Sequence, residues 1–171
     1  MTQQARSDRD RDPSGRARNA RPRDYLGRPL PRSTTSEPPA PDDPALPAAE
    51  ALAVAQDLLD AGRPFHAHEV LEAVWKAAPP AERDLWQGLA QIAVGLTHAL
   101  RGNGRGAAAL LRRGADRLDG YARPGPHDID IDGIQQTCRA LADRIEMSGL
   151  EGVDPSGLRI RLRAGRSSRA S

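Results

Sequence analysis

The sixteen residues from Leu85 to Leu100, LWQGLAQIAVGLTHAL, contain no Asp, Glu, Lys or Arg. A stretch without charge is usually surrounded by other elements, and this one is too short to cross a membrane. Its leucines and isoleucine recur at the spacing of one helix face. It therefore predicts a buried central helix, about Ala81–Arg101. Gly88 and Gly95 are costly inside a helix, so they predict the close approach of another backbone.

Start and stop signals predict five helices in all, over about residues 47–61, 66–78, 81–101, 106–118 and 132–148. Pro47 opens the first helix and Gly62 follows its end. Asp132, with Gln135 three residues later, resembles a capping box that starts the fifth, and Gly149 is its stop. Apart from the short IDI at 129–131, no segment alternates like a strand with turn signals around it. The predicted fold class is all-α: a compact bundle of about five helices built from antiparallel αα-hairpins.

Charge divides the chain into basic, acidic and basic parts. Residues 1–32 carry nine Arg and four Asp, and residues 152–171 carry five Arg and one Asp. Between them, residues 42–151 carry eleven Arg and Lys against seventeen Asp and Glu. The terminal parts have little to bury and are predicted to be disordered or flexible. The predicted parts are a disordered Arg- and Pro-rich tail (1–44), a helical domain (45–148) and a flexible basic tail (149–171).

Composition also predicts where such a chain works. Its single cysteine, Cys138, excludes an intramolecular disulfide and fits a reducing compartment. The first residues lack the apolar segment of a secretory signal, so we predict a cytoplasmic protein without a membrane partner. Basic tails can contact nucleic acid, but interspersed acidic residues and a single aromatic, Tyr25, weaken that prediction. A protein partner and a homo-oligomer are left open.

Two of the predicted helices carry polar residues where a core-facing stripe is expected. In FHAHEVLEAVW, His68 and Glu72 lie on the same side as Leu71 and Trp75, and Trp75 is predicted to be buried against the central helix. The short turn at Pro79-Pro80 makes the two helices antiparallel neighbours, so their polar stripes are predicted to meet. The candidate site residues are His68, Glu69, Glu72, Gln87, Gln91 and His98.

The meeting of these stripes has two interpretations. One is a satisfied polar network in which amides and imidazoles donate to a carboxylate, without any ligand. The other is a metal-dependent or hydrolase-like site, in which His68 and Glu72 grip a divalent metal and His98 is a third ligand. The motif is H-E-x-x-E and not the H-E-x-x-H of zinc proteases, so it lacks the second imidazole. Whether the chain is an enzyme is left open.

Together, FHAHEVLEAVW and LWQGLAQIAVGLTHALRGNGRGAAALLRRGADRL resemble the bacterial and archaeal family catalogued as domain of unknown function 309, over roughly residues 47–147. The resemblance implies a small all-α fold, and it implies no activity. The N-terminal RARNARPRDYLGRPLPR resembles an extension found in actinobacterial members. The positions characteristic of the family are His68, Glu69, Glu72, Trp75, Gln87, Gly88, Gln91 and His98.

An internal repeat supports an alternative function class. At an offset of 40 residues the sequence pairs Gly62 with Gly102, Ala67 with Ala107, and Leu71 with Leu111. Each glycine ends one predicted helix and precedes the next, so the first four helices are interpreted as two related hairpins. Hairpin repeats of similar length build tetratricopeptide-like interaction modules. The alternative is therefore a non-enzymatic helical-hairpin module that binds another protein.

Overall fold

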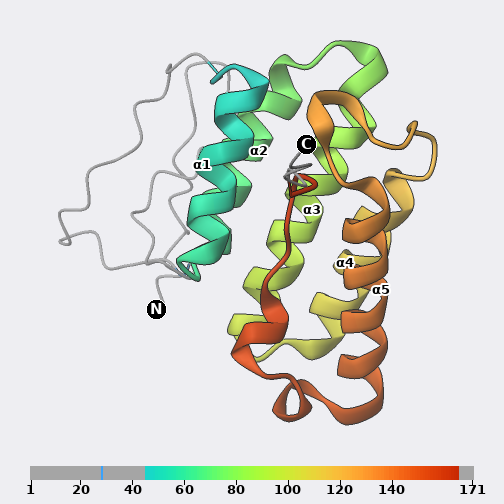
Figure 1. The fold of residues 1–171 in the computed structure, drawn as a ribbon. Helices are drawn as coiled ribbons and strands as arrows, with labels where there is room; N and C mark the ends of the chain where they lie inside the picture. Colours follow the sequence, from blue (N-terminus) through green and yellow to red (C-terminus); the bar gives the residue numbers. More distant parts are fainter. Residues whose placement is uncertain (1–27, 29–44, 166–171) are drawn as a thin grey trace, which may run out of the picture.

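The computed structural model describes residue 28 and residues 45–165, in which five α-helices follow one another up and down (Figure 1). Each helix packs mainly on the helices before and after it in the chain, and α3 and α4 share the largest interface. The predicted all-α fold of antiparallel hairpins is confirmed. The helices are α1 (Ala48–Asp60), α2 (Pro64–Ala77), α3 (Arg83–Leu100), α4 (Gly104–Arg117) and α5 (Ile131–Ser148).

Most of the predicted N-terminal tail lies outside the described residues. Of residues 1–44 the structure describes only Arg28, and it does not describe residues 166–171. None of the helices in the described ranges is long and apolar enough to cross a membrane.

The turns after α1 and α3 have the same backbone geometry. Gly62 and Gly102 follow the two helices with φ of +71° and +81°, a left-handed conformation that side chains with a Cβ rarely adopt. The Gly62 amide donates to the Leu59 carbonyl and the Gly102 amide donates to the Ala99 carbonyl, each at 3.1 Å. Each turn is also closed by one longer backbone hydrogen bond, from Arg63 to Leu58 (2.8 Å) and from Asn103 to His98 (2.9 Å).

The buried positions that follow these turns repeat as well. Ala67 and Leu71 on α2 are wholly buried, and so are Ala107 and Leu111 on α4, at an offset of 40 residues. The hairpin α1–α2 and the hairpin α3–α4 therefore present equivalent core positions.

Glycines let α3 and α4 approach each other closely. A Cβ built on Gly88 of α3 would lie 2.9 Å from the carbonyl oxygen of Gly114, and one built on Gly114 would lie 2.8 Å from that of Gly88. A Cβ on Gly95 would lie 3.2 Å from the Leu111 nitrogen and 3.3 Å from the Ala107 carbonyl oxygen. The predicted approach of another backbone is confirmed, and α4 is the helix that makes it.

Trp86, rather than Trp75, is the tryptophan of the core. Trp86 is 1% exposed, whereas Trp75 is half-buried at the edge of the core. The prediction that Trp75 is buried holds only in part, because Trp75 packs against the core but stays partly exposed. At about 100° per residue, the buried residues of α2 form a stripe whose centre lies between Ala67 and Leu71. Val74 lies inside this stripe, and Trp75 lies at its edge.

The N-cap of the fifth helix is Asp130, two residues before the predicted cap Asp132. The Asp130 side chain accepts a hydrogen bond from the Gly133 amide at 3.0 Å. The predicted cap, Asp132, contacts Arg123 instead. Gln135, the predicted second member of the capping box, is buried and donates to the Ala115 carbonyl of α4 at 2.9 Å.

The described chain continues past the predicted domain end at 148, and Ile160 and Leu162 of the predicted flexible tail (149–171) join the buried core, while residues 166–171 lie outside the described residues. Two 3₁₀ turns, η3 (Leu150–Gly152) and η4 (Pro155–Leu158), lead into an extended segment that returns between α1 and α5 (Figure 1). Ile160 and Leu162 are 1% and 2% exposed there.

The tail prediction relied on the net charge of this segment and overlooked its pattern. In RIRLR, residues 159–163, apolar residues alternate with Arg, and alternation lets an extended chain bury every second side chain. Ile129, in the short IDI noted above, forms an isolated antiparallel bridge with Arg163.

Candidate functional site

His68 and Glu72 lie one turn apart on α2, at the edge of its buried stripe. The His68 Nε2 is 3.7 Å from one carboxylate oxygen of Glu72, and the other oxygen is 3.0 Å from the Nζ of Lys76. The side chains of His68 and Glu72 are 22% and 33% exposed. The opening of the pair to solvent explains how a carboxylate can lie beside a core stripe.

Two imidazoles near the start of α2 have a buried nitrogen without a partner. The Nδ1 atoms of His66 and His68 are buried and accept or donate no hydrogen bond. The ring of Phe65 lies against both, with centroid distances of 5.9 and 6.0 Å. Burial lowers the pKa of both histidines, and for His68 the charge of Glu72 opposes that effect. The fold thus favours neutral imidazoles here.

Acidification is expected to destabilise the protein through these two histidines. Their pKa values in the folded protein lie below the unfolded value of about 6.5, so the unfolded chain takes up protons more readily. Their contribution to the free energy of unfolding is complete above that pH and is lost as the pH falls from it through the lower pKa values of the folded protein. We expect a lower melting temperature at about pH 5.5 than at about pH 7.5, measured by circular dichroism.

Two variants assign this pH dependence to His68. His68→Gln should reduce the decrease in melting temperature. Glu72→Gln should enlarge it, because it removes the charge that raises the pKa of His68. If both variants follow the wild-type curve, the imidazole of His68 does not contribute.

Two of the three candidate residues of α3, Gln91 and His98, find partners away from α2. The Oε1 of Gln91 accepts a hydrogen bond from the Nε of Arg117 on α4, at 3.2 Å. The Nδ1 of His98 lies 2.8 Å from the Nδ2 of Asn103 in the turn before α4. Gln87 is half-buried. These contacts tie α3 to α4 and not to α2.

The two polar stripes therefore do not form one network in the part of the chain that the structure describes. No hydrogen bond or ion pair there joins His68 or Glu72 to the three candidates of α3, and Glu69 is exposed. The core stripe of α2 is centred on the other side of Leu71, which leaves His68 and Glu72 at its edge and partly exposed. Among the described residues, no group of three or more His, Cys, Asp or Glu side chains is arranged to hold a metal ion.

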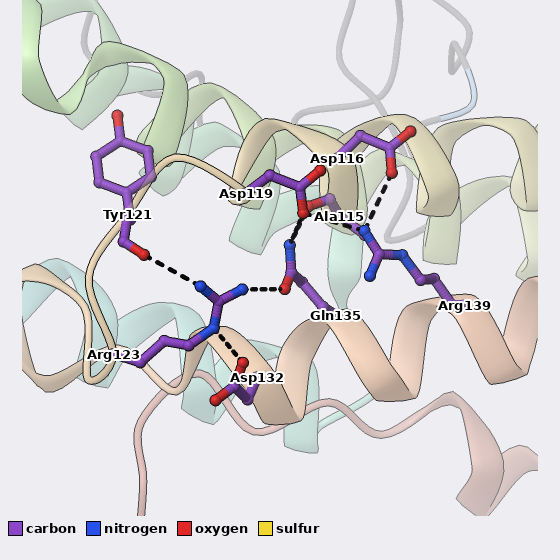
Figure 2. A network of polar contacts seen from close by, with 8 residues as sticks. All are labelled: Ala115, Asp116, Asp119, Tyr121, Arg123, Asp132, Gln135 and Arg139. Atoms are coloured by element: carbon purple, nitrogen blue, oxygen red, sulfur yellow. Dashed lines mark hydrogen bonds and ion pairs between the residues drawn. The ribbon is translucent and has the colours of Figure 1, made fainter.

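A network of polar contacts joins the end of α4 to α5 (Figure 2). Gln135 is 4% exposed, and its Nε2 donates to the Ala115 carbonyl at 2.9 Å and to the Asp119 carboxylate at 2.6 Å. Its Oε1 accepts from Arg123 at 2.9 Å, and Arg123 also binds Asp132. Because both polar atoms of Gln135 have partners, this buried amide ties the α4–α5 loop to both helices.

A second cluster holds the same loop against the start of α3. The carboxylate of Glu82 accepts from the indole of Trp86 at 3.0 Å and lies 3.0 Å from the Nε2 of His127. These hydrogen bonds, from Trp86 first and His127 second, hold the pKa of Glu82 below its usual range. His127 and Asp128 both have positive φ, 59° and 61°, a strained conformation that the surrounding contacts maintain. Sequence reasoning assigned His127 no role.

Sequence reasoning also missed Gln56 on α1. Its Nε2 donates to the Ile160 carbonyl at 3.1 Å, and its Oε1 accepts from the Leu162 amide at 2.8 Å. One amide side chain thus pairs with the main chain on both sides of Arg161. Nothing in the sequence of α1 indicates this contact. The alternation of residues 159–163 was the one pattern that could have indicated it.

The segment from α1 into α4 matches a known family. The family model described as Domain of unknown function (DUF309) matches residues 52–110. The predicted resemblance is confirmed for this segment. The DUF309 segment contains Gln56 and all six candidate residues of α2 and α3, and it ends before the C-terminal extended segment.

One relative of the chain carries a name without an activity. The "Uncharacterized protein YpuF" of Bacillus subtilis (strain 168) is 46% identical over 48 residues, which are 28% of this chain and 28% of that protein. The chain therefore aligns with little more than a quarter of that relative's length. No solved structure matches the chain.

Proposed function

We propose that this protein is a non-enzymatic helical-hairpin module that binds an extended segment of polypeptide. The observation that supports this proposal is the pairing of Gln56 with the carbonyl of Ile160 and the amide of Leu162. Both bonds go to the main chain, so they select for an extended backbone whatever side chain lies between them. Recognition of extended peptides by other domains uses the same division between main-chain bonds and side-chain pockets.

The repeated hairpins also support this function. Similar turns at Gly62 and Gly102, with buried residues at matching positions behind them, support the interpretation of α1–α2 and α3–α4 as related hairpins. Repeats of paired helices build extended surfaces on which other proteins bind. A module of this kind needs no converging catalytic groups.

A metal-dependent or hydrolase-like site at His68 and Glu72 is the second candidate function. The buried Nδ1 of His68, which has no partner, is the observation that favours it. The pair supplies two ligands, and the third predicted ligand, His98, is engaged with Asn103. A divalent metal cofactor, contact of the tails with nucleic acid, a homo-oligomer and a cytoplasmic location remain predictions.

Peptide selection followed by mapping separates the two functions. The intact chain would be used to select short peptides from a random library, and amide chemical shifts would locate the peptides on the protein. We expect enrichment of peptides that shift Gln56 and Asp130, on the two sides of the extended segment. No enrichment, or shifts confined to α2 around His68, would contradict the proposal.

Metal titration completes this test. A metal site would bind zinc or manganese and raise the melting temperature by mass action, and Glu72→Gln would abolish that increase. We expect no increase for the wild type, purified without a histidine tag. An increase that depends on Glu72 would favour the second candidate function.

A further inference from the structure

The chain's own residues 158–163, LRIRLR, lie in a site made by segments far away in sequence. We call these residues the strap. On one side, Gln56 of α1 binds the main chain of Ile160 and Leu162. On the other side, the Asp130 amide donates to the Leu162 carbonyl at 3.0 Å, and Ile129 forms a bridge with Arg163. The strap is therefore bonded through its backbone to α1 and to the start of α5.

The side chains of the strap alternate between the bundle and solvent. Ile160 and Leu162 belong to the buried core, whereas Arg159, Arg161 and Arg163 are exposed. This is how an extended peptide binds: the backbone makes the hydrogen bonds, and every second side chain enters a pocket. The segment that leads into the strap, around η4, is mostly exposed.

The strap does not fill the space available to it. A cavity of about 330 Å³ lies beside Leu158, which is only half-buried. Its other apolar walls include Leu59 of α1 and Leu96 and Leu100 of α3. Because Leu100 is also one of the few large apolar side chains left exposed in the described residues, a larger side chain at the position of Leu158 would bury more apolar surface.

Carboxylates lie at both ends of the strap. The carboxylate of Asp128 is 3.8 Å from the guanidinium of Arg163. At the other end, Asp60 and Arg159 line the same cavity. The site thus favours a segment in which basic residues alternate with apolar ones.

We propose that the strap site is an exchangeable peptide site whose partner is an extended basic segment of another protein, with apolar residues at alternate positions. The strap is the internal competitor that occupies the site until the partner displaces it. This inference rests on the proposed function and adds the chemistry of the partner and its regulation. Because the strap is part of the same chain, it competes with the partner at a high effective concentration. Removal of the strap from the site therefore strengthens binding of the partner segment.

Spin labelling of the full chain tests the exchange. Arg161→Cys places a label on an exposed residue between the two buried side chains. Cys138 is wholly buried, and burial raises the pKa of its thiol to about 12, so the reagent reacts at the introduced cysteine. The probe is a free peptide of residues 156–165, SGLRIRLRAG. We expect the mobile component of the spectrum to grow and saturate as peptide is added.

A matched peptide with Asp at positions 160 and 162 is the control, and it should leave the label immobile. A label that stays immobile at every concentration of the native peptide, or that responds equally to the control peptide, would overturn the inference. A dimer detected by light scattering while the label stays immobile would identify the strap of a second copy as the occupant and would also overturn it.

Affinity gives a second measurement. In the full chain, Ile160→Ala with Leu162→Ala weakens the strap and leaves the residues of α1 and α5 intact. This variant should bind the fluorescent native peptide at least about tenfold more tightly than the wild type, provided its helical circular dichroism is retained. Equal affinities would contradict internal competition. Selected peptides that mobilise the label but lack alternating basic and apolar residues, while the native peptide leaves it immobile, would retain the proposed function and reject only this inference.

Discussion

Trp86→Ala is expected to lower the free energy of unfolding by about 3–5 kcal/mol, the range for a buried tryptophan. Trp86 is 1% exposed and has the largest of the wholly buried side chains in the described residues. Its indole also donates to Glu82, so the substitution removes core volume and one of the two hydrogen bonds to that carboxylate. Urea unfolding followed by helical circular dichroism measures the change without depending on tryptophan fluorescence.

Trp75→Ala is the matched control, because Trp75 is half-buried at the edge of the core. It should cost about 1–2 kcal/mol, since only part of its apolar surface leaves water on folding. A larger loss for Trp75 than for Trp86 would show that the core stripe of α2 has been placed wrongly.

Gly114→Ala should lower the free energy of unfolding by about 1–3 kcal/mol through overpacking. The added Cβ would lie 2.6 Å from Cγ1 of Ile92 and 2.8 Å from the carbonyl oxygen of Gly88. The Gly88 carbonyl oxygen is a backbone atom and cannot rotate away as a side chain can. The added Cβ therefore forces α3 and α4 to move apart. This loss outweighs the roughly 1 kcal/mol by which Ala is the better helix former.

Gly120→Ala is the control for this substitution. A Cβ at Gly120 meets no atom within 4 Å, so its unfolding free energy should change by less than about 0.5 kcal/mol. If Gly114→Ala were as stable as Gly120→Ala, the close approach of α3 and α4 would not be a constraint on the fold.

The helices could be predicted because their ends depend on local chemistry. Gly62 and Gly102 mark helix ends that the structure reproduces with left-handed glycines, and the charge-free Leu85–Leu100 became the buried part of α3. The rotation of α2 could not be predicted in the same way. Its apolar residues fit a stripe centred on either side of Leu71, and the choice depends on what the neighbouring helices present.

The candidate site was predicted less well than the fold. His68 and Glu72 do lie together on α2, since the spacing along one helix fixes that. Their predicted contact with Gln91 and His98 depended on how two helices face each other, which spacing does not determine. Gln56 has no distinguishing neighbours in sequence, and its partners Ile160 and Leu162 are more than a hundred residues away.

That separation has a consequence for the protein as it is made. The bond between Gln56 and Ile160 spans 104 residues, whereas the hairpins close over short turns. Contacts between neighbouring helices form early, and a contact that closes so long a loop forms late. On the ribosome the helices emerge before the strap does, and domains fold as they emerge. Every newly made molecule therefore passes through an interval in which the strap site is vacant and the first segment to reach it can come from a neighbour.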